Sequence, residues 1–275
     1  MILELPQPYD FELSTTRFRA FGRDVSFVWH EGGLHRVVAG REVRIEAAPG
    51  GVRIEPGGSE AIADGVGRLL GLPFELEPFR AWASRDPVLG PVVAGLAGFR
   101  PPLNPAPFEA LVVAITTQQI SLLAAAAIRS RFVERFGVKH DVVWEFPTQE
   151  RVAAADLADF DGLGFSQRKV SYVLAVARSD LDLEALGLLA DDEVAAALTA
   201  LPGIGEWTSD WFLARHLARP RAWPAGDLGL RKAVAAFYAP GRSLSIGEVR
   251  SMGERFAPFE NLSAQFLLMG ARLAG

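Results

Sequence analysis

One segment in the last third of the chain has the residues of a phosphate-binding turn. LPGIGEWTSDW, residues 201–211, sets two glycines around Ile204, between a helical pattern ending near Ala200 and another beginning near Thr208. Glycine allows backbone angles and close approaches that a Cβ obstructs. The free N–H groups and the dipole at the start of the second helix attract an anion such as a DNA phosphate. A plain helix–helix turn is the alternative, since Pro and Gly punctuate many turns.

An aspartate follows this turn, twenty residues after Trp207. Asp227 directly precedes the helical run LGLRKAV, so its simplest role is an N-cap that accepts hydrogen bonds from the N–H groups of Gly229 or Leu230. A carboxylate at a cleft also stabilises a sugar that becomes positive as its base departs. The two roles are compatible, because a capping carboxylate remains an anion.

Length and composition limit the class of protein. The 275 residues are 49% hydrophobic and 22% charged, which suits a folded chain of two or three domains. No apolar run approaches the roughly 20 residues that span a bilayer, and the N-terminus lacks the order of a signal peptide. We therefore expect a cytoplasmic protein without a membrane partner. Because the chain has no cysteine, we expect no disulfide and no iron–sulfur cluster.

The net charge of −5 argues mildly against a nucleic-acid partner, but the charge is unevenly distributed. Residues 201–275 hold nine Lys and Arg against six Asp and Glu, a net +3, so the rest of the chain carries −8. The asymmetry permits DNA binding at the C-terminal end. The four histidines (His30, His35, His140 and His216) lack metal-ligand spacing and are interpreted as surface or satisfied core residues.

The hydrophobic pattern changes along the chain. Residues 1–56 read as strands in an antiparallel meander, with β-branched segments at 25–30, 34–38, 41–47 and 51–55 separated by glycine turns. Helical spacing follows from residue 61, and GFRPPLNPAP at 98–107 is a stiff connector. From Phe108 the chain reads as helical, beginning with one long helix over Phe108–Phe136 that has Gln118 and Gln119 near its middle. The pattern predicts an α+β chain, with an antiparallel β-rich domain at 1–98 and a helical domain at 99–275.

A hairpin of the form LPGIGxWT followed by a Pro…Asp-Leu-Gly segment resembles the helix-hairpin-helix DNA glycosylase superfamily, and within it the 3-methyladenine DNA glycosylase II (AlkA) family. NPAPFEALVVAITTQQIS is similar to that family's entry helix, and LGFSQRKVSYVLAVA to its middle-domain connector. The resemblance implies two helical lobes with a cleft between them. It also implies a monomeric base-excision repair enzyme that flips alkylated purines, of the 3-methyladenine and 7-methylguanine type, out of double-stranded DNA and hydrolyses them off.

The resemblance assigns roles to individual residues. It makes Asp227 the catalytic carboxylate and Gln119 the wedge that fills the duplex where the base has left, with Gln118 beside it on the DNA. It implies a base pocket and a phosphate-holding hairpin, whose residues are Trp207, Trp211 and Phe259 for the pocket and Gly203, Ile204, Gly205 and Thr208 for the hairpin. The carbonyls of Leu201 and Ile204 are the expected ligands of a Na⁺ or K⁺ ion, and no other cofactor is expected.

Two features narrow the resemblance. Trp207 stands where bifunctional members have a lysine, so we expect hydrolysis without strand cleavage. Gly226 replaces a larger polar residue before the aspartate, and FAPFE at 256–260 replaces a segment rich in Trp and Arg, which leaves the pocket shape open. Three alternatives therefore remain: a glycosylase for hypoxanthine, uracil or an oxidised purine, a DNA-binding module without chemistry, and a helical protein unrelated to nucleic acid.

Overall fold

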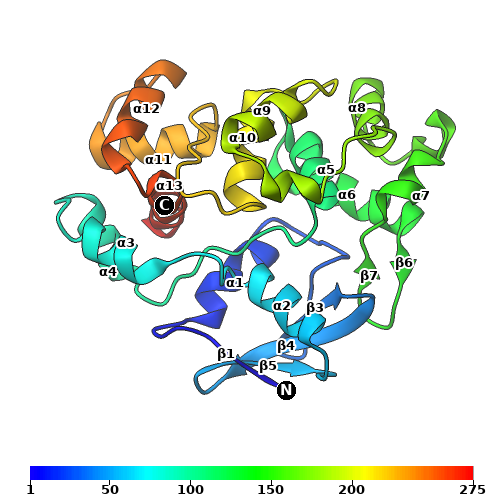
Figure 1. The fold of residues 1–275 in the computed structure, drawn as a ribbon, viewed down its shortest axis with the longest axis horizontal. Helices are drawn as coiled ribbons and strands as arrows, with labels where there is room; N and C mark the ends of the chain where they lie inside the picture. The colour runs from blue at the N-terminus through cyan, green and yellow to red at the C-terminus, as the bar shows by residue number, and fades with distance from the viewer. Residues whose placement is uncertain (275) are drawn as a thin grey trace.

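The computed structural model describes residues 1–274 and confirms the α+β class. Five strands form one antiparallel sheet in the order β1-β5-β4-β3-β2. Their bounds are Ile2–Glu4, Val28–His30, Gly33–Val38, Arg41–Ala48 and Gly51–Glu55 for β1 to β5. Figure 1 shows this sheet at one end of the molecule, with most of the helices arched over the other. None of the helices within residues 1–274 is long and apolar enough to cross a membrane.

The sheet has its own core. Alternate residues of β4, Val43 and Ile45, are fully buried on one face, as the period of two in a strand requires. They pack with Phe11 of α1 (Phe11–Ala20) and with Ile62 of α2 (Glu60–Leu69). Helix α1 lies within the range that we predicted as strands only. It forms because Asp10 accepts a hydrogen bond from the Leu13 N–H at 2.9 Å and caps the first turn.

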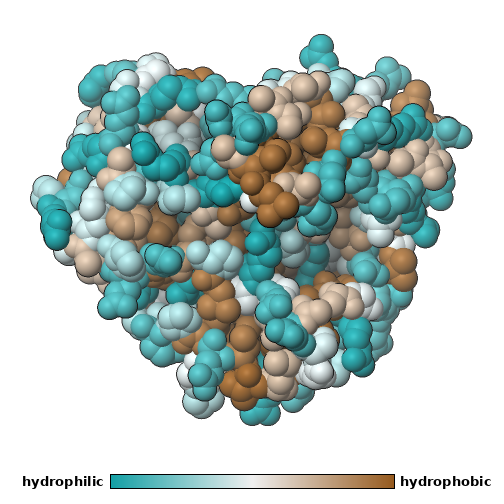
Figure 2. Space-filling model, viewed as in Figure 1, coloured by the Kyte–Doolittle hydropathy of each residue, from teal (hydrophilic) through white to brown (hydrophobic). Residues whose placement is uncertain are grey.

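The helices fall into two further hydrophobic clusters. One is built from α5, α6, α8, α9 and α10 within residues 108–222 together with Val25, and the other joins α3 and α4 to α11, α12 and α13. Figure 2 shows the outline of the molecule indented between the part that holds α9 and α10 and the part that holds α11 and α12. Helices α3 and α4 thus share a core with the C-terminal helices. The division at residues 98 and 99 stays a prediction.

The remaining elements complete the frame of the helical part. The helices are α3 (Leu76–Ala83), α4 (Leu89–Gly95), α5 (Pro107–Thr117), α6 (Leu122–Phe136), α7 (Gln149–Ala153), α8 (Gln167–Ala177), α9 (Asp191–Thr199), α10 (Glu206–Arg215), α11 (Leu228–Tyr238), α12 (Ile246–Gly253) and α13 (Glu260–Ala274). Short 3-10 turns lie at Leu157–Phe160, Ala185–Leu188 and Glu254–Phe256, and a small hairpin joins β6 (Val138–Lys139) to β7 (Trp144–Glu145).

The single long helix expected over Phe108–Phe136 is wrong. The chain leaves α5 after Thr117 and enters α6 at Leu122, so the two glutamines lie in a loop rather than in a helix. Gln119 adopts a left-handed backbone with φ of +57°, and Ser121 caps α6 by accepting from the Ala124 N–H at 3.2 Å. The serine is a capping signal inside an otherwise continuous helical pattern, and the cap ends the helical path there.

Candidate active site

The turn between α9 and α10 is a tight hairpin in which the two glycines differ. Gly203 has φ of +82°, and a Cβ added there would lie 2.0 Å from the ring of Tyr172. Both the backbone conformation and the lack of space therefore require glycine at this position. Gly205 is the N-cap of α10 with an ordinary φ of −104°, and an added Cβ would meet nothing within 4 Å. Intramolecular packing therefore explains Gly203 but leaves Gly205 facing open space.

The carboxylate of Asp227 is the centre of the site. Its Oδ1 accepts the N–H of Leu230 at 2.8 Å and caps α11, which confirms the predicted N-cap. Its Oδ2 accepts the indole N–H groups of both Trp207 and Trp211, each at 3.1 Å. Three of the roughly four acceptor positions of a carboxylate are therefore occupied, and the side chain is fixed while remaining half-exposed. The structure brings together the predicted catalytic residue and two of the three predicted pocket residues.

The two tryptophans have different surroundings. The guanidinium of Arg215, one helical turn further along α10, lies 4.7 Å from the ring centroid of Trp211, so one face of that indole already holds a cation. Trp207 contacts Gly226: a Cβ on Gly226 would lie 3.6 Å from the Trp207 Cβ, which is an ordinary contact. Gly226 therefore packs against Trp207, and Asp227 is held by its own hydrogen bonds even though the residue before it is small.

Positive charge collects around Arg215. Burial lowers the pKa of Arg215 well below its usual value, the nearby charge of Arg17 lowers it further, and the anionic Asp227 opposes the shift. Arg272 adds a third positive charge. Among residues 1–274 these three arginines form no ion pair with a carboxylate. The charges that act on Arg215 are therefore the two positive charges of Arg17 and Arg272 and the negative charge of Asp227.

The two glutamines lie next to the hairpin, and each has a separate place. The Gln118 side chain donates to the Gly203 carbonyl at 3.0 Å and to the Thr208 hydroxyl at 3.3 Å, which joins the α5–α6 loop to the hairpin. Gln119 is exposed, and exposed apolar side chains follow it at Ile120 and Leu122. Thr208 itself is buried. Gln118 is thus held inward and Gln119 is free to project.

Phe259 lies in a different aromatic group. Its ring centroid is 5.8 Å from that of Phe79 and 5.6 Å from that of Trp82, in the core shared by α3 and α13. Within residues 1–274, the aromatic contacts of Phe259 do not include Trp207 or Trp211. Its place in a base pocket stays a prediction.

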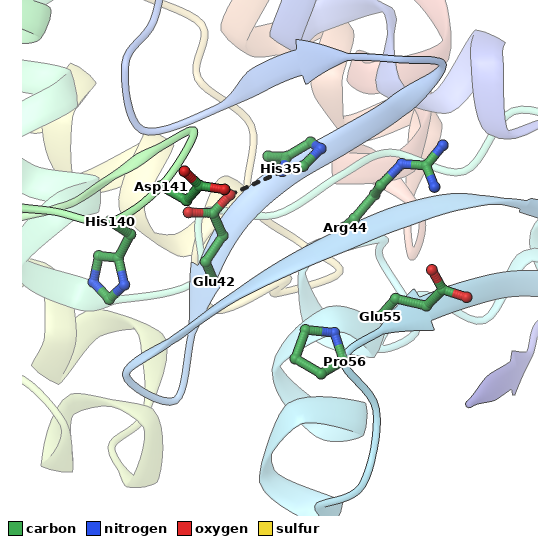
Figure 3. Close-up of a pocket in the computed structure, with 7 residues that line it drawn as sticks. All are labelled: His35, Glu42, Arg44, Glu55, Pro56, His140 and Asp141. Carbon is green, nitrogen blue, oxygen red and sulfur yellow. Dashed lines mark hydrogen bonds and ion pairs between the residues drawn. The ribbon is translucent and has the colours of Figure 1, made fainter.

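Two other features bear on ligands. In the hairpin, the Leu201 carbonyl accepts one hydrogen bond, from the Ile204 N–H at 3.2 Å, and keeps a second lone pair. The described residues contain no group of three or more His, Asp or Glu side chains placed to hold a metal. A hollow of about 430 Å³ lies between the sheet and the β6–β7 hairpin. Figure 3 shows it lined by His35, hydrogen-bonded to Glu42, and by other charged side chains, none of which belongs to the site around Asp227.

The sequence patterns missed two residues of this neighbourhood. Arg215 was not singled out, although it lies four residues after Trp211 on one helix, which is the spacing of facing side chains. The sequence patterns likewise assign no role to Lys169, at the start of α8. In the structure its ammonium is half-buried and donates to two backbone carbonyls, those of Thr116 at 2.8 Å and Gln118 at 2.7 Å.

Comparison with known proteins places the chain in a family. The family described as HhH-GPD superfamily base excision DNA repair protein matches residues 112–256. A DNA-3-methyladenine glycosylase of Bacillus subtilis is 31% identical over 179 residues, 62% of this chain and 59% of its own length. The DNA-3-methyladenine glycosylase 2 of Escherichia coli is 29% identical over 180 residues, 63% of this chain and 61% of its own. The chain thus spans about three fifths of the length of these curated relatives.

Solved structures agree over a longer range. A 3-methyladenine DNA-glycosylase from Archaeoglobus fulgidus superposes with a TM-score of 0.89 at 27% identity and covers 100% of this chain and 99% of that one. An 8-oxoguanine glycosylase/lyase from Clostridium acetobutylicum has a TM-score of 0.81 at 20% identity over 97% and 92% of the two chains, which shows a shared fold. Because the family match extends over more than half of its residues, the chain belongs to the HhH-GPD superfamily of base excision DNA repair proteins.

Proposed function

We propose that the protein is a monofunctional DNA glycosylase that flips alkylated purines, of the 3-methyladenine and 7-methylguanine type, out of duplex DNA and releases them by hydrolysis. One observation carries the proposal. The carboxylate of Asp227 is fixed by the indole N–H groups of Trp207 and Trp211 on the helix that starts at the hairpin. A fixed, half-exposed anion beside a phosphate-binding turn suits the stabilisation of a sugar cation.

The proposed reaction assigns one step to each part of the site. The N-terminus of α10 binds a DNA phosphate, and Gln119 enters the base stack when the damaged nucleotide rotates out. As the bond between the sugar and the base breaks, the electron pair leaves with the base and the Asp227 carboxylate stabilises the positive sugar. Water then adds to the sugar carbon and gives up a proton, to the Asp227 carboxylate or to solvent, which leaves an abasic site. Trp207 stands at the position of the amine nucleophile, so no Schiff base forms and the strand stays intact.

Partners and ions follow from the same site. The substrate is double-stranded DNA containing a damaged base, and the proposed active form is a monomer. The carbonyls of Leu201 and Ile204 are the proposed ligands of a Na⁺ or K⁺ ion at the hairpin, and the second lone pair of the Leu201 carbonyl supports this proposal. The ion supports the turn that grips the phosphate and takes no part in bond breaking.

The test of the function is base release from methylated DNA. Asp227→Asn should reduce the single-turnover rate of release at least about 100-fold, because the negative charge beside the sugar is lost. Duplex binding, measured by fluorescence anisotropy, should persist. Asp64→Asn, the same change at an exposed residue of α2, is the control and should release bases as the unaltered protein does. Normal release by Asp227→Asn, or none by the unaltered protein, would sink the proposal.

A second candidate substrate class is favoured by Arg215. A cation already covers one face of Trp211, and two more arginine charges act nearby, so a positively charged alkylpurine meets repulsion there. Neutral lesions with carbonyl acceptors, such as hypoxanthine, suit guanidinium donors better. Release rates on duplexes containing hypoxanthine, uracil, 8-oxoguanine or 7-methylguanine separate the two classes. A preference for hypoxanthine over 7-methylguanine would favour the second.

A further inference from the structure

The loop that carries Gln119 is anchored by a lysine from another helix. The Lys169 ammonium, in the first turn of α8, donates to the carbonyls of Thr116 at 2.8 Å and Gln118 at 2.7 Å. These carbonyls lie at the C-terminal end of α5, where helical carbonyls lack partners and the helix dipole is negative. The lysine therefore satisfies both carbonyls and places its charge where the dipole favours it.

This anchor lies directly before a strained residue. Gln119 follows the second bonded carbonyl and has φ of +57°, a left-handed conformation that is unfavourable for a non-glycine residue. Such a conformation persists when its surroundings fix it. Burial lowers the pKa of Lys169, in keeping with an ammonium withdrawn from water onto the backbone.

The other side of the loop is tied to the hairpin. The Gln118 side chain donates to the Gly203 carbonyl at 3.0 Å, so a chain of hydrogen bonds leads from α8 through the loop to the phosphate-binding turn. Gly203 in turn packs its backbone against the ring of Tyr172, which also belongs to α8. Helix α8 thus supports both the α5–α6 loop that carries Gln119 and the hairpin between α9 and α10.

We propose that Lys169 is a positioning residue for base flipping: it holds Gln118 and Gln119 so that the wedge and the phosphate grip meet the duplex in one fixed relation. The inference rests on the proposed function, since it takes Gln119 as the wedge. Lys169 acts through these two residues without contacting the lesion or the sugar. Loss of the Lys169 side chain should therefore weaken binding to a duplex with a gap in its base stack, while binding to DNA phosphates persists.

The neighbouring residue provides a matched control. Arg168 is exposed and carries the same charge one position earlier on α8. Lys169→Met keeps the aliphatic stem and removes the charge and its hydrogen bonds, whereas Arg168→Met removes a charge alone. Any general loss of attraction to DNA is therefore common to both variants. Lys169→Arg restores donors at the same place and should rescue most of the effect.

The readout is the ratio of two affinities, for a duplex with a tetrahydrofuran abasic site and for the undamaged duplex. The abasic duplex has an empty stack for the wedge, so its extra affinity measures wedge placement without requiring chemistry. Lys169→Met should reduce this ratio about tenfold, the scale of one lost charge-assisted anchor. Arg168→Met should shift both affinities equally and leave the ratio as it was.

The outcomes distinguish the positioning role of Lys169 from the proposed glycosylase function. An equal ratio for Lys169→Met and Arg168→Met would overturn the positioning role. Thermal unfolding shows whether Lys169→Met folds. If it does not, Gln118→Leu removes the hydrogen bonds between the loop and the hairpin and should lower the ratio instead. A preserved ratio in that variant would also overturn the inference. Failure of the unaltered protein to release bases from methylated DNA, with the ratio effect intact, would refute the glycosylase function alone.

Discussion

Asp227 is held by donors of two kinds, a backbone N–H on one oxygen and two indole N–H groups on the other. A carboxylate can accept all three, whereas an amide has one acceptor oxygen and one donor group. In Asp227→Asn, the amide N–H₂ must therefore face either the indoles or the Leu230 N–H. We expect this variant to lose about 1–3 kcal/mol of unfolding free energy in addition to its activity. Urea unfolding measures the loss, and a stability equal to that of Asp64→Asn would contradict the observed hydrogen bonds.

The two glycines of the hairpin give a second test at the scale of single residues. Gly205→Asp supplies a good N-cap for α10, so the unfolding free energy should change by less than about 0.5 kcal/mol. Its negative charge should weaken duplex binding about tenfold if the helix start faces a phosphate. Gly205→Asn has nearly the same shape without the charge and should bind more tightly than Gly205→Asp. Equal affinities of these two variants in fluorescence anisotropy would rule out a phosphate at this position.

Gly203 should behave in the opposite way. Gly203→Ala puts a Cβ onto the Tyr172 ring at a positive φ, so it should destabilise the fold by about 2 kcal/mol or more, as steric strain in a packed site does. A thermal unfolding curve separates this structural effect from the binding effect at Gly205. An alanine variant as stable as the unaltered protein would show that the hairpin relaxes.

At the scale of the element, helix α10 carries an aspartate, Asp210, whose ionised form is disfavoured by burial. Burial, and after it the neighbouring Glu206, raise the pKa of Asp210 to about 7 against the opposing charge of Arg250. The pKa of an unfolded aspartate is near 4, so the folded state binds the extra proton between these values. Unfolding free energy therefore falls as the pH rises from about 4 to about 7.

Asp210→Asn removes this proton dependence. Relative to the unaltered protein, the variant should gain about 1–2 kcal/mol between pH 4 and pH 8, a figure reduced from the full shift because the side chain is partly exposed to solvent. Chemical unfolding across that range measures the gain, and Asp64→Asn serves as the exposed control. Parallel stability curves for Asp210→Asn and the unaltered protein would show that the carboxyl titrates in its ordinary range.

The sequence predicted the elements that depend on local signals. The hairpin glycines, the Asp227 cap and the strands β3 to β5 follow from turn chemistry, capping residues and β-branched segments, and the structure contains each of them. The break between α5 and α6 was missed, because the capping role of Ser121 competes with a strong helical pattern on both sides. The bonds from the indoles to Asp227 and from Lys169 to α5 join residues far apart in the chain. These contacts depend on how the helices pack against one another, which local patterns in a single sequence do not reveal.

At the scale of the whole molecule, ion pairs join the N-terminal part to the helices. Arg36 of β3 pairs with Glu109 of α5, and both side chains are buried. Arg36 also donates to the Ser26 carbonyl at 3.1 Å. A second pair links Asp24, beside the sheet, to Arg129 of α6 at 2.6 Å. The helices on either side of the α5–α6 loop are therefore each attached to the N-terminal part, so that part helps to set where Gln119 lies.

The Arg36–Glu109 pair gives a test of this attachment. Glu109→Gln leaves a buried guanidinium without its counter-charge and should cost about 3–5 kcal/mol of unfolding free energy. The double variant Arg36→Met with Glu109→Leu removes both charges and should recover most of that loss. Glu55→Gln, at an exposed residue of β5 whose pairing with Arg53 spans 3.9 Å, is the control and should change stability by less than about 1 kcal/mol. Urea unfolding of the single and the double variant measures the loss and its recovery. If Glu109→Gln lost no more than Glu55→Gln, the pair would not hold the sheet to α5.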